Sequence, residues 1–143
     1  MPERTPNLLF VCIENSNRSQ MAEGFARTLG RGRVSACSAG SRPSGQVNPR
    51  AIQFMLEKGI DLAEQRSKGL DELPRVTWDY IVTMGCGDAC PTLPALHRLD
   101  WTLPDPKLLP DDGFRAIRDQ IEGLIAGLID DALAPPARAE EPK

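Results

Sequence analysis

The sequence predicts an α/β fold built on an open parallel sheet. Short apolar runs rich in strand-forming residues alternate along the chain with segments whose apolar residues follow helical spacing. The first of these runs, "NLLFVCI", has no polar alternation, which is typical of a strand buried on both faces. In such sheets ligands bind beyond the carboxyl ends of the strands, beside the N-termini of the helices that follow.

The expected order is strand, helix, strand, helix, strand, long loop, helix. The three strands are expected at residues 7–13, 33–38 and 78–84. The first helix begins near Ser19 and is stopped by Gly30 and Gly32. The second follows a capping Asn48 with a proline at its first position and closes at Gly59.

The second half of the chain is less regular. Residues 69–75 predict a short helical piece, and residues 85–110 hold five prolines without periodicity. We expect this long segment to be irregular, because long loops in compact domains are often functional. The last helix is expected to start near Asp111 or Asp112. Residues 1–134 are expected to form a single domain and residues 135–143 a disordered tail.

Composition narrows the function classes. The chain has 143 residues, 41% hydrophobic and 26% charged, as ordinary globular domains do. Its net charge of -3 argues against nucleic acid or an anionic membrane as the main partner. Neither an apolar run of membrane-spanning length nor the apolar core of a secretory signal is evident, so the cytoplasm is the expected compartment. The four cysteines are then expected to be redox, catalytic or metal groups rather than a disulfide framework.

A cysteine and an arginine flank the loop that follows the first strand. Cys12 ends the strand, and Arg18 stands six positions later, where the helix begins. The loop "IENSN" between them is long enough to turn several backbone N–H groups inward around a tetrahedral oxyanion. The helix N-terminus adds unpaired donors, and Arg18 adds a planar fork for two oxygens. We expect the anion to be bound by Ile13, Glu14, Asn15, Ser16, Asn17, Arg18 and Ser19.

Each of these residues also has an ordinary structural interpretation. A cysteine at a strand end is often a small buried hydrophobe, and an arginine at a helix start is often solvated. The order strand, Cys, five residues, Arg-Ser, amphipathic helix nevertheless matches what a thiolate nucleophile requires. Ser19 is expected to cap the helix and to donate a hydrogen bond to Cys12, and Asn15 to brace the loop.

The segment "VCIENSNRSQMAEGFAR" resembles the phosphate-binding loop of the low-molecular-weight tyrosine phosphatases, which share their fold with thioredoxin-coupled arsenate reductases. "SAGSRP", "VNPRAIQFMLEKGIDL" and "LPDPK" resemble further segments of that family. The resemblance covers residues 7–133 and implies an open four-stranded parallel sheet with helices on both faces. It also implies that Asp105, before Pro106, is the general acid. Glu14 stands where the family usually has glycine, and Asn17 where many members have a second cysteine.

A second thiol-bearing segment is "MGCGDACP", in which Cys86 and Cys90 are four positions apart. Resemblance to the arsenate reductases implies that these two are a resolving pair. Two alternatives stay open: a zinc site completed by His97 and an acidic side chain, and passive loop thiols. Cys37, on the alternating second strand, is interpreted as a core residue, and His97 as a solvated loop residue.

The favoured function is reduction of arsenate by Cys12, with Asp105 protonating the departing oxygen. The resemblance then implies a Cys12–Cys86 disulfide, its transfer to Cys86–Cys90, and reduction by thioredoxin or a similar dithiol protein, with no metal or organic cofactor. One alternative is a low-molecular-weight protein tyrosine phosphatase that forms a cysteinyl phosphate. Lys107 and the leucines after it stand where phosphotyrosine-specific members carry tyrosines, which weakens that reading. Another alternative is a non-catalytic oxyanion-responsive or redox-sensing module.

Overall fold

A computed structural model describes residues 5–84 and 93–134. The predictions that concern Cys86, Cys90 and the tail at 135–143 lie outside the described residues. Among the helices that are described, none is long and apolar enough to cross a membrane.

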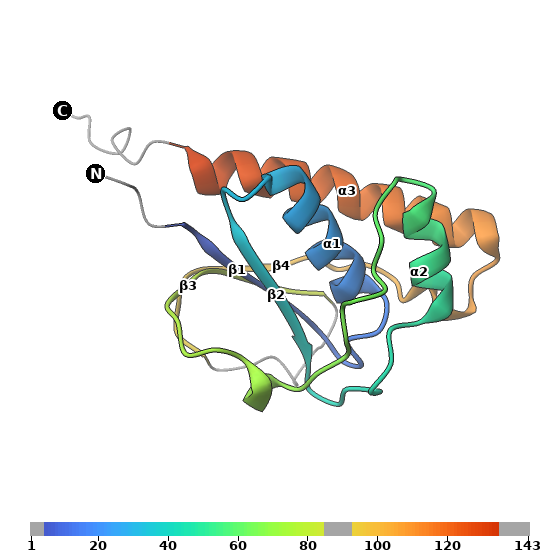
Figure 1. The fold of residues 1–143 in the computed structure, drawn as a ribbon, viewed down its shortest axis with the longest axis horizontal. Helices are drawn as coiled ribbons and strands as arrows, with labels where there is room; N and C mark the ends of the chain where they lie inside the picture. The colour runs from blue at the N-terminus through green and yellow to red at the C-terminus, as the bar shows by residue number, and fades with distance from the viewer. Residues whose placement is uncertain (1–4, 85–92, 135–143) are drawn as a thin grey trace.

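Within residues 5–84 and 93–134, the sheet has four strands, all parallel, in the order β2-β1-β3-β4. They are β1 (Asn7–Cys12), β2 (Ser35–Gly40), β3 (Trp78–Thr83) and β4 (Ala95–Asp100). Cys12 pairs with Gly40 at the last position of both strands, and the neighbouring Val11 pairs with Thr83 at the end of β3. The carboxyl ends of three strands therefore meet at one edge of the sheet (Figure 1). The all-parallel four-stranded sheet confirms the predicted fold class, but the α-helices that the structure describes do not lie on both faces of it.

The three α-helices in the described part of the chain lie together on one face of the sheet (Figure 1). They are α1 (Arg18–Gly30), α2 (Pro49–Leu56) and α3 (Asp111–Leu133). The side chains of β1 alternate between two clusters: Leu8, Phe10 and Cys12 face these helices, whereas Leu9 and Val11 face the opposite side.

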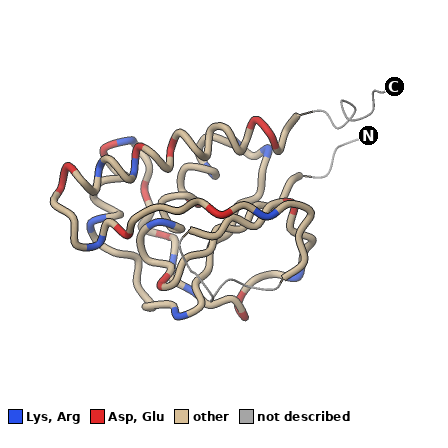
Figure 2. The backbone as a smooth tube through the Cα atoms, turned by 180° about the vertical axis from the view of Figure 1, so that it is seen from behind, with Lys and Arg blue, Asp and Glu red and all other residues tan. Residues whose placement is uncertain are grey.

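The opposite face of the sheet is covered, within the described residues, by the short 3-10 helix η1 (Leu70–Glu72), whose Leu70 packs there together with Leu73. A second 3-10 turn, η3 (Pro106–Leu108), precedes α3. Basic and acidic residues are interspersed over the described chain (Figure 2), in keeping with the small net charge of -3.

Strand β4 corrects the expectation that residues 85–110 are irregular throughout. Its sequence, "ALHRLD", has no β-branched residue, and its side chains are mostly exposed because it pairs only with β3 at the edge of the sheet. Because neither face of this strand is buried, its sequence has no alternation of apolar and polar residues that would predict a strand. Strand β2 also lies two residues later than predicted, so that it ends at Gly40.

Candidate active site

The loop between β1 and α1 forms the floor of a hollow at the carboxyl edge of the sheet. Cys12 is the last residue of β1 and Arg18 the first of α1. The hollow is lined by Cys12, Ile13, Glu14, Ser16, Asn17, Arg18 and Asp105. Of the predicted anion-binding residues, only Asn15 and Ser19 lie outside this lining, and both are fully buried. The structure thus brings the nucleophile, arginine and acid predicted from sequence into one place.

The carbonyl groups of the loop turn away from the hollow. Arg42 N–H donates to the Ile13 carbonyl at 2.8 Å, and Ser44 N–H donates to the Glu14 carbonyl at 3.0 Å. Asn48 N–H donates to the Ser16 carbonyl at 3.0 Å. In contrast, no backbone N–H from residue 14 to residue 19 donates to an acceptor within the described part of the chain. These amides are left to bind an anion.

Gly40 allows this loop to pack against β2. A Cβ atom at this position would lie 2.5 Å from the Ile13 carbonyl oxygen and 2.9 Å from the Asn15 nitrogen. Both are backbone atoms that cannot move aside, so the position requires glycine.

Asn15 braces the loop from behind, as expected. Its backbone is left-handed, with φ of 51°, a conformation that asparagine adopts more readily than most residues. Its side-chain NH₂ donates to Ser19 Oγ at 2.8 Å. Its Oδ1 accepts from Lys68 N–H and from Gln20 Nε2, both at 2.9 Å. All three partners fix the orientation of the amide.

Ser19 does not cap the helix, which corrects one prediction. Helix α1 begins one residue earlier, at Arg18, and the residue at the N-cap is Asn17, which makes no side-chain cap bond. The Ser19 hydroxyl instead lies 2.9 Å from the Cys12 sulfur, so the expected contact between these two side chains is present.

Arg18 is buried, with 7% of its surface exposed. Its Nη1 donates to the Leu103 carbonyl at 2.8 Å, which anchors the guanidinium, and Nη2 lies 3.9 Å from Asp105 Oδ2. Its Nε is buried and has no partner among the described residues. A buried charged donor without an acceptor is costly, so this atom indicates that the hollow is built to take an anion.

Asp105 lies at the edge of the hollow, with 46% of its side chain exposed. It is the N-cap of η3: its Oδ1 accepts from Lys107 N–H at 3.0 Å. Its other oxygen faces Arg18. A carboxyl group placed between solvent and the anion can exchange a proton with water and deliver it to a leaving oxygen.

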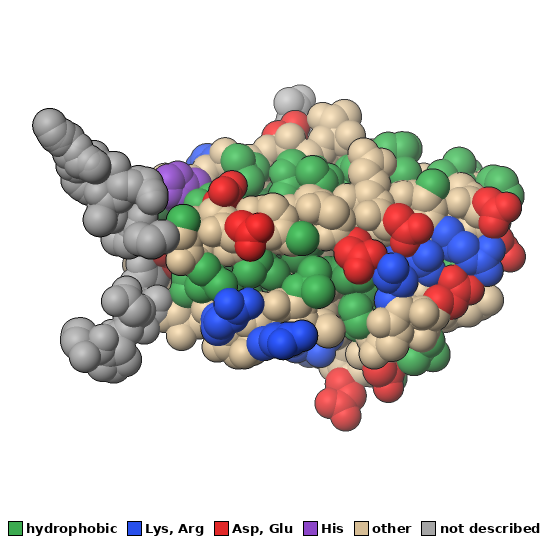
Figure 3. Space-filling view, turned by 90° about the horizontal axis from the view of Figure 1, so that it is seen from above, with side chains coloured by type: hydrophobic (Ala, Val, Ile, Leu, Met, Phe, Trp, Pro, Cys, Tyr) green, Lys and Arg blue, Asp and Glu red, His purple; other side chains and the backbone are tan. Residues whose placement is uncertain are grey.

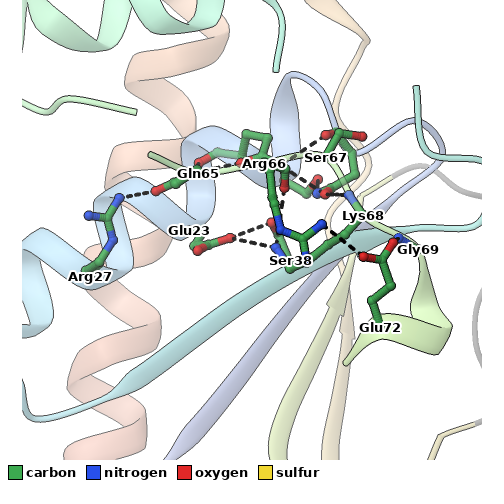
Figure 4. Close-up of polar contacts among 12 residues, drawn as sticks. Glu23, Arg27, Ser38, Gln65, Arg66, Ser67, Lys68, Gly69 and Glu72 are labelled. Atoms are coloured by element: carbon green, nitrogen blue, oxygen red, sulfur yellow. Dashed lines mark hydrogen bonds and ion pairs between the residues drawn. The ribbon is translucent and has the colours of Figure 1, made fainter. Parts of the chain in front are cut away.

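The wall behind the loop was not predicted from the sequence. Gln20 reaches the carbonyl of Arg66 at 2.9 Å, and Ser67 Oγ donates to the Glu14 carbonyl at 2.9 Å. Lys68 Nζ lies 3.8 Å from Glu23, and Ser38 donates to the same carboxylate at 2.5 Å (Figure 4). The stretch 65–69 carries no recognisable motif, and its contacts with the loop join residues about fifty positions apart. These contacts can be identified only from the three-dimensional structure.

The remaining described candidates lie away from the hollow. Cys37 is half-buried beside the cluster on the second face of the sheet, and burial, with a further contribution from Glu23, raises the pKa of its thiol. A raised pKa lowers the thiolate fraction at neutral pH and so makes this thiol less reactive. His97 is exposed, but it lies on strand β4 rather than in the loop that was expected, and its ring stacks on Tyr80.

Cys86 and Cys90 lie outside the described residues. The last residue before that gap, Met84, donates its N–H to the carbonyl of Val11, the neighbour of Cys12, at 2.8 Å. The chain therefore leaves β3 beside Cys12.

Comparisons with known proteins agree with this fold. A family model described as "Low molecular weight phosphotyrosine protein phosphatase" matches residues 7–136. A Synechocystis sp. protein named "Glutaredoxin arsenate reductase" is 38% identical over 125 residues, which cover 85% of this chain and 95% of that protein.

Two solved structures are similar over most of the chain. One, described as "An arsenate reductase in the phosphate binding state", has a TM-score of 0.80 and 36% identity, and covers 89% of this chain and 98% of its own. A thioredoxin-dependent arsenate reductase of Corynebacterium glutamicum has a TM-score of 0.74 and 31% identity, over 92% of this chain and 64% of that one. From the extent of these matches, the chain belongs to the low molecular weight phosphotyrosine protein phosphatase family.

Proposed function

We propose that this protein is an arsenate reductase that converts arsenate to arsenite with electrons from thiols. The observation that carries the proposal is the hollow itself: Cys12 and Arg18 both line it, and the Nε of Arg18 and the loop N–H groups have no partner among the described residues. That arrangement suits a tetrahedral oxyanion. The choice of arsenate is supported by relatives that carry the name arsenate reductase at up to 38% identity over most of the chain.

The first step is nucleophilic substitution at arsenic. The Cys12 thiolate, which faces the Ser19 hydroxyl, forms an S–As bond, and one As–O bond breaks. Asp105 gives its proton to the departing oxygen, which leaves as water. The loop amides and Arg18 hold the remaining oxygens and stabilise the charge that develops on them. Arsenic is still pentavalent at this stage.

The second step is the reduction. The thiolate of Cys86 attacks the Cys12 sulfur, the S–As electron pair stays on arsenic, and arsenite leaves as the trivalent product. A Cys12–Cys86 disulfide remains. Cys90 then attacks Cys86 and frees the Cys12 thiolate, so that the disulfide moves to Cys86–Cys90. The position of Met84 beside Val11 supports Cys86 as the attacking thiol.

An external dithiol protein closes the cycle by reducing the Cys86–Cys90 disulfide. The names of two relatives mention glutaredoxin and thioredoxin, so we propose a reductant of this type. Such dithiols are kept reduced in the cytoplasm, which we propose as the compartment of the protein.

The proposal is tested by replacing Cys86 with serine. With thioredoxin, its reductase and NADPH as the sole source of electrons, we expect Cys86→Ser to abolish multiple turnover of arsenate. Cys37→Ala is the matched control and should turn over like the wild type, because Cys37 does not line the hollow. Mass spectrometry after one turnover should find Cys12 joined to Cys86 in a Cys90→Ser variant. Sustained turnover by Cys86→Ser would refute the relay.

A further inference from the structure

The rim of the hollow carries an ion pair that the proposed mechanism does not use. Glu14 Oε1 and Lys107 Nζ lie 3.4 Å apart, although the two residues are 93 positions apart in sequence. Glu14 belongs to the oxyanion loop and lines the hollow. Lys107 belongs to η3 and stands two positions after Asp105, the residue through which that segment lines the hollow. We propose that this pair, called here the rim pair, selects a free inorganic oxyanion over an oxyanion that bears an organic substituent.

The first step is the charge at Glu14. A carboxylate beside the hollow repels a dianionic ligand, and this one is 42% exposed, so solvent screens it only in part. The Lys107 ammonium offsets that repulsion. A half-exposed pair of this kind adds little to folding stability. Its effect is therefore expected on ligand binding rather than on the fold.

The second step is the connection from Lys107 to Asp105. The Lys107 N–H donates to Asp105 Oδ1 at 3.0 Å, and its carbonyl accepts from Arg50 Nη1 at 3.2 Å. Arg50 is in turn paired with Asp111 at the start of α3, at 3.1 Å. The Lys107 backbone is thus bonded to α2 directly and to α3 through the Arg50 side chain. The ion pair between the Lys107 and Glu14 side chains therefore connects the wall that carries Asp105 to the oxyanion loop.

The third step is steric. A free oxyanion has only oxygens around its central atom and fits within the ring of amides. An ester or a phosphonate carries a substituent that has to leave through the mouth of the hollow, between the Glu14 wall and the Asp105 wall. A bond between these walls resists the widening that such a ligand needs. This inference deepens the proposed function by naming what would exclude phosphomonoesters.

The test measures binding, so it does not depend on arsenate turnover. Dissociation constants for inorganic phosphate and for phenylphosphonate are measured by calorimetry for the wild type, Glu14→Gln, Lys107→Gln and the double variant. Lys58→Gln is the matched control, because Lys58 forms a similarly exposed pair with Glu122 that does not belong to the hollow.

We expect the two single variants to shift phosphate affinity in opposite directions. Glu14→Gln should tighten phosphate binding and Lys107→Gln should weaken it, each by about two- to five-fold, the range expected of a partly exposed charge pair. A purely structural role would weaken binding in both variants. Shifts in the same direction would overturn the charge effect and with it the proposal.

Selectivity is the second readout. Because both probes carry a similar charge when they are measured at the same pH, the ratio of their dissociation constants removes the charge effect and isolates the steric one. In both single variants we expect the affinity for phenylphosphonate, relative to that for phosphate, to rise by about two- to five-fold over the wild type. The double variant should show the same rise and no more, because either single substitution already removes the ion pair. An unchanged ratio in the single variants would overturn the proposal, whether or not the wild type reduces arsenate.

Discussion

The Cys12 sulfur and the Ser19 hydroxyl oxygen lie 2.9 Å apart, and the neighbouring Asn15 amide leaves the hydroxyl proton free to point at the sulfur. Asn15 Oδ1 accepts from Lys68 and from Gln20, so the NH₂ of the same amide must face Ser19. Because that NH₂ donates to Ser19 Oγ, the hydroxyl does not use its own proton for Asn15 and can direct it toward the sulfur. We therefore expect Ser19 to be the donor when the Cys12 sulfur acts as a nucleophile, since hydrogen bonds to charged acceptors are the stronger ones.

Replacing Ser19 with alanine removes this donor. We expect alkylation of Cys12 by iodoacetamide at neutral pH to slow by about ten-fold, since a hydrogen bond to a charged group is worth roughly 1.5–3 kcal/mol. Arsenate turnover should fall by at least the same factor. Ser35→Ala, at an exposed position of β2, is the control and should match the wild type. Equal alkylation rates in all three proteins would show that the serine does not act on the sulfur.

Asn15→Asp should reverse the direction of the hydrogen bonds. A carboxylate keeps the acceptors for Lys68 and Gln20 but cannot donate to Ser19, so the hydroxyl would turn away from the sulfur and donate to position 15. We expect urea denaturation to show a smaller loss of stability than Asn15→Ala, in which Lys68 N–H loses its acceptor. Alkylation of Cys12 should nevertheless be slower than in Ser19→Ala, because a negative charge now lies nearby. Faster alkylation would contradict this order of donors.

The loop that holds these residues was predictable because its signal is contiguous. The strand, the loop and the helix occupy adjacent positions, so residue order alone places Cys12, Arg18 and their amides together. The role of Asp105 as general acid was predicted only from the family resemblance, since an Asp-Pro pair taken alone indicates a turn. Gln20, Ser67 and Lys68 could not be predicted, because their role depends on a packing contact. The cap at Ser19 was wrong because its hydroxyl already bonds Cys12 and Asn15, a tertiary demand that overrides a local preference.

Arg18→Lys tests whether oxyanion binding requires the planar guanidinium of Arg18. Lysine keeps the charge but cannot donate to the Leu103 carbonyl and to an oxyanion in the same geometry. We expect the affinity for inorganic phosphate, measured by calorimetry, to fall by about ten- to hundred-fold, the loss of one or two charge-assisted hydrogen bonds. Arg42→Lys, at an exposed position next to the loop, should bind phosphate as the wild type does. Unchanged affinity in Arg18→Lys would mean that the anion does not use this side chain.

Asp105→Asn tests the proton donor. Asparagine retains an oxygen that accepts from Lys107 N–H, so η3 should keep its cap. We expect kcat for arsenate to fall by about 10²- to 10⁴-fold, the usual contribution of a general acid, with phosphate affinity unchanged or tighter. Stopped-flow measurement of the first turnover separates this step from reduction of the disulfide. A normal first turnover would assign the proton to another group.

Glu57 links α2 to α3 and should make stability depend on pH. Its carboxylate accepts hydrogen bonds from Arg115 at 2.9 Å and from Arg118 at 2.6 Å, and acidic and basic side chains gather at this end of the molecule (Figure 3). The bond from Arg115, followed by that from Arg118, lowers the pKa of Glu57 from 4.5 to about 2. A depressed pKa in the folded state contributes stability that is complete above pH 4.5 and is lost as the pH falls toward 2.

Glu57→Gln should therefore melt at a lower temperature than the wild type at pH 7. This gap in melting temperature should narrow steadily as the pH falls from 4.5 to 2. Added salt should narrow it as well, because the carboxylate is 38% exposed. Glu64→Gln, at an exposed loop position, serves as the control. Calorimetric melting curves across this pH range decide the matter: a gap that stays constant down to pH 2 would mean that the charge of Glu57 does not stabilise the contact between α2 and α3.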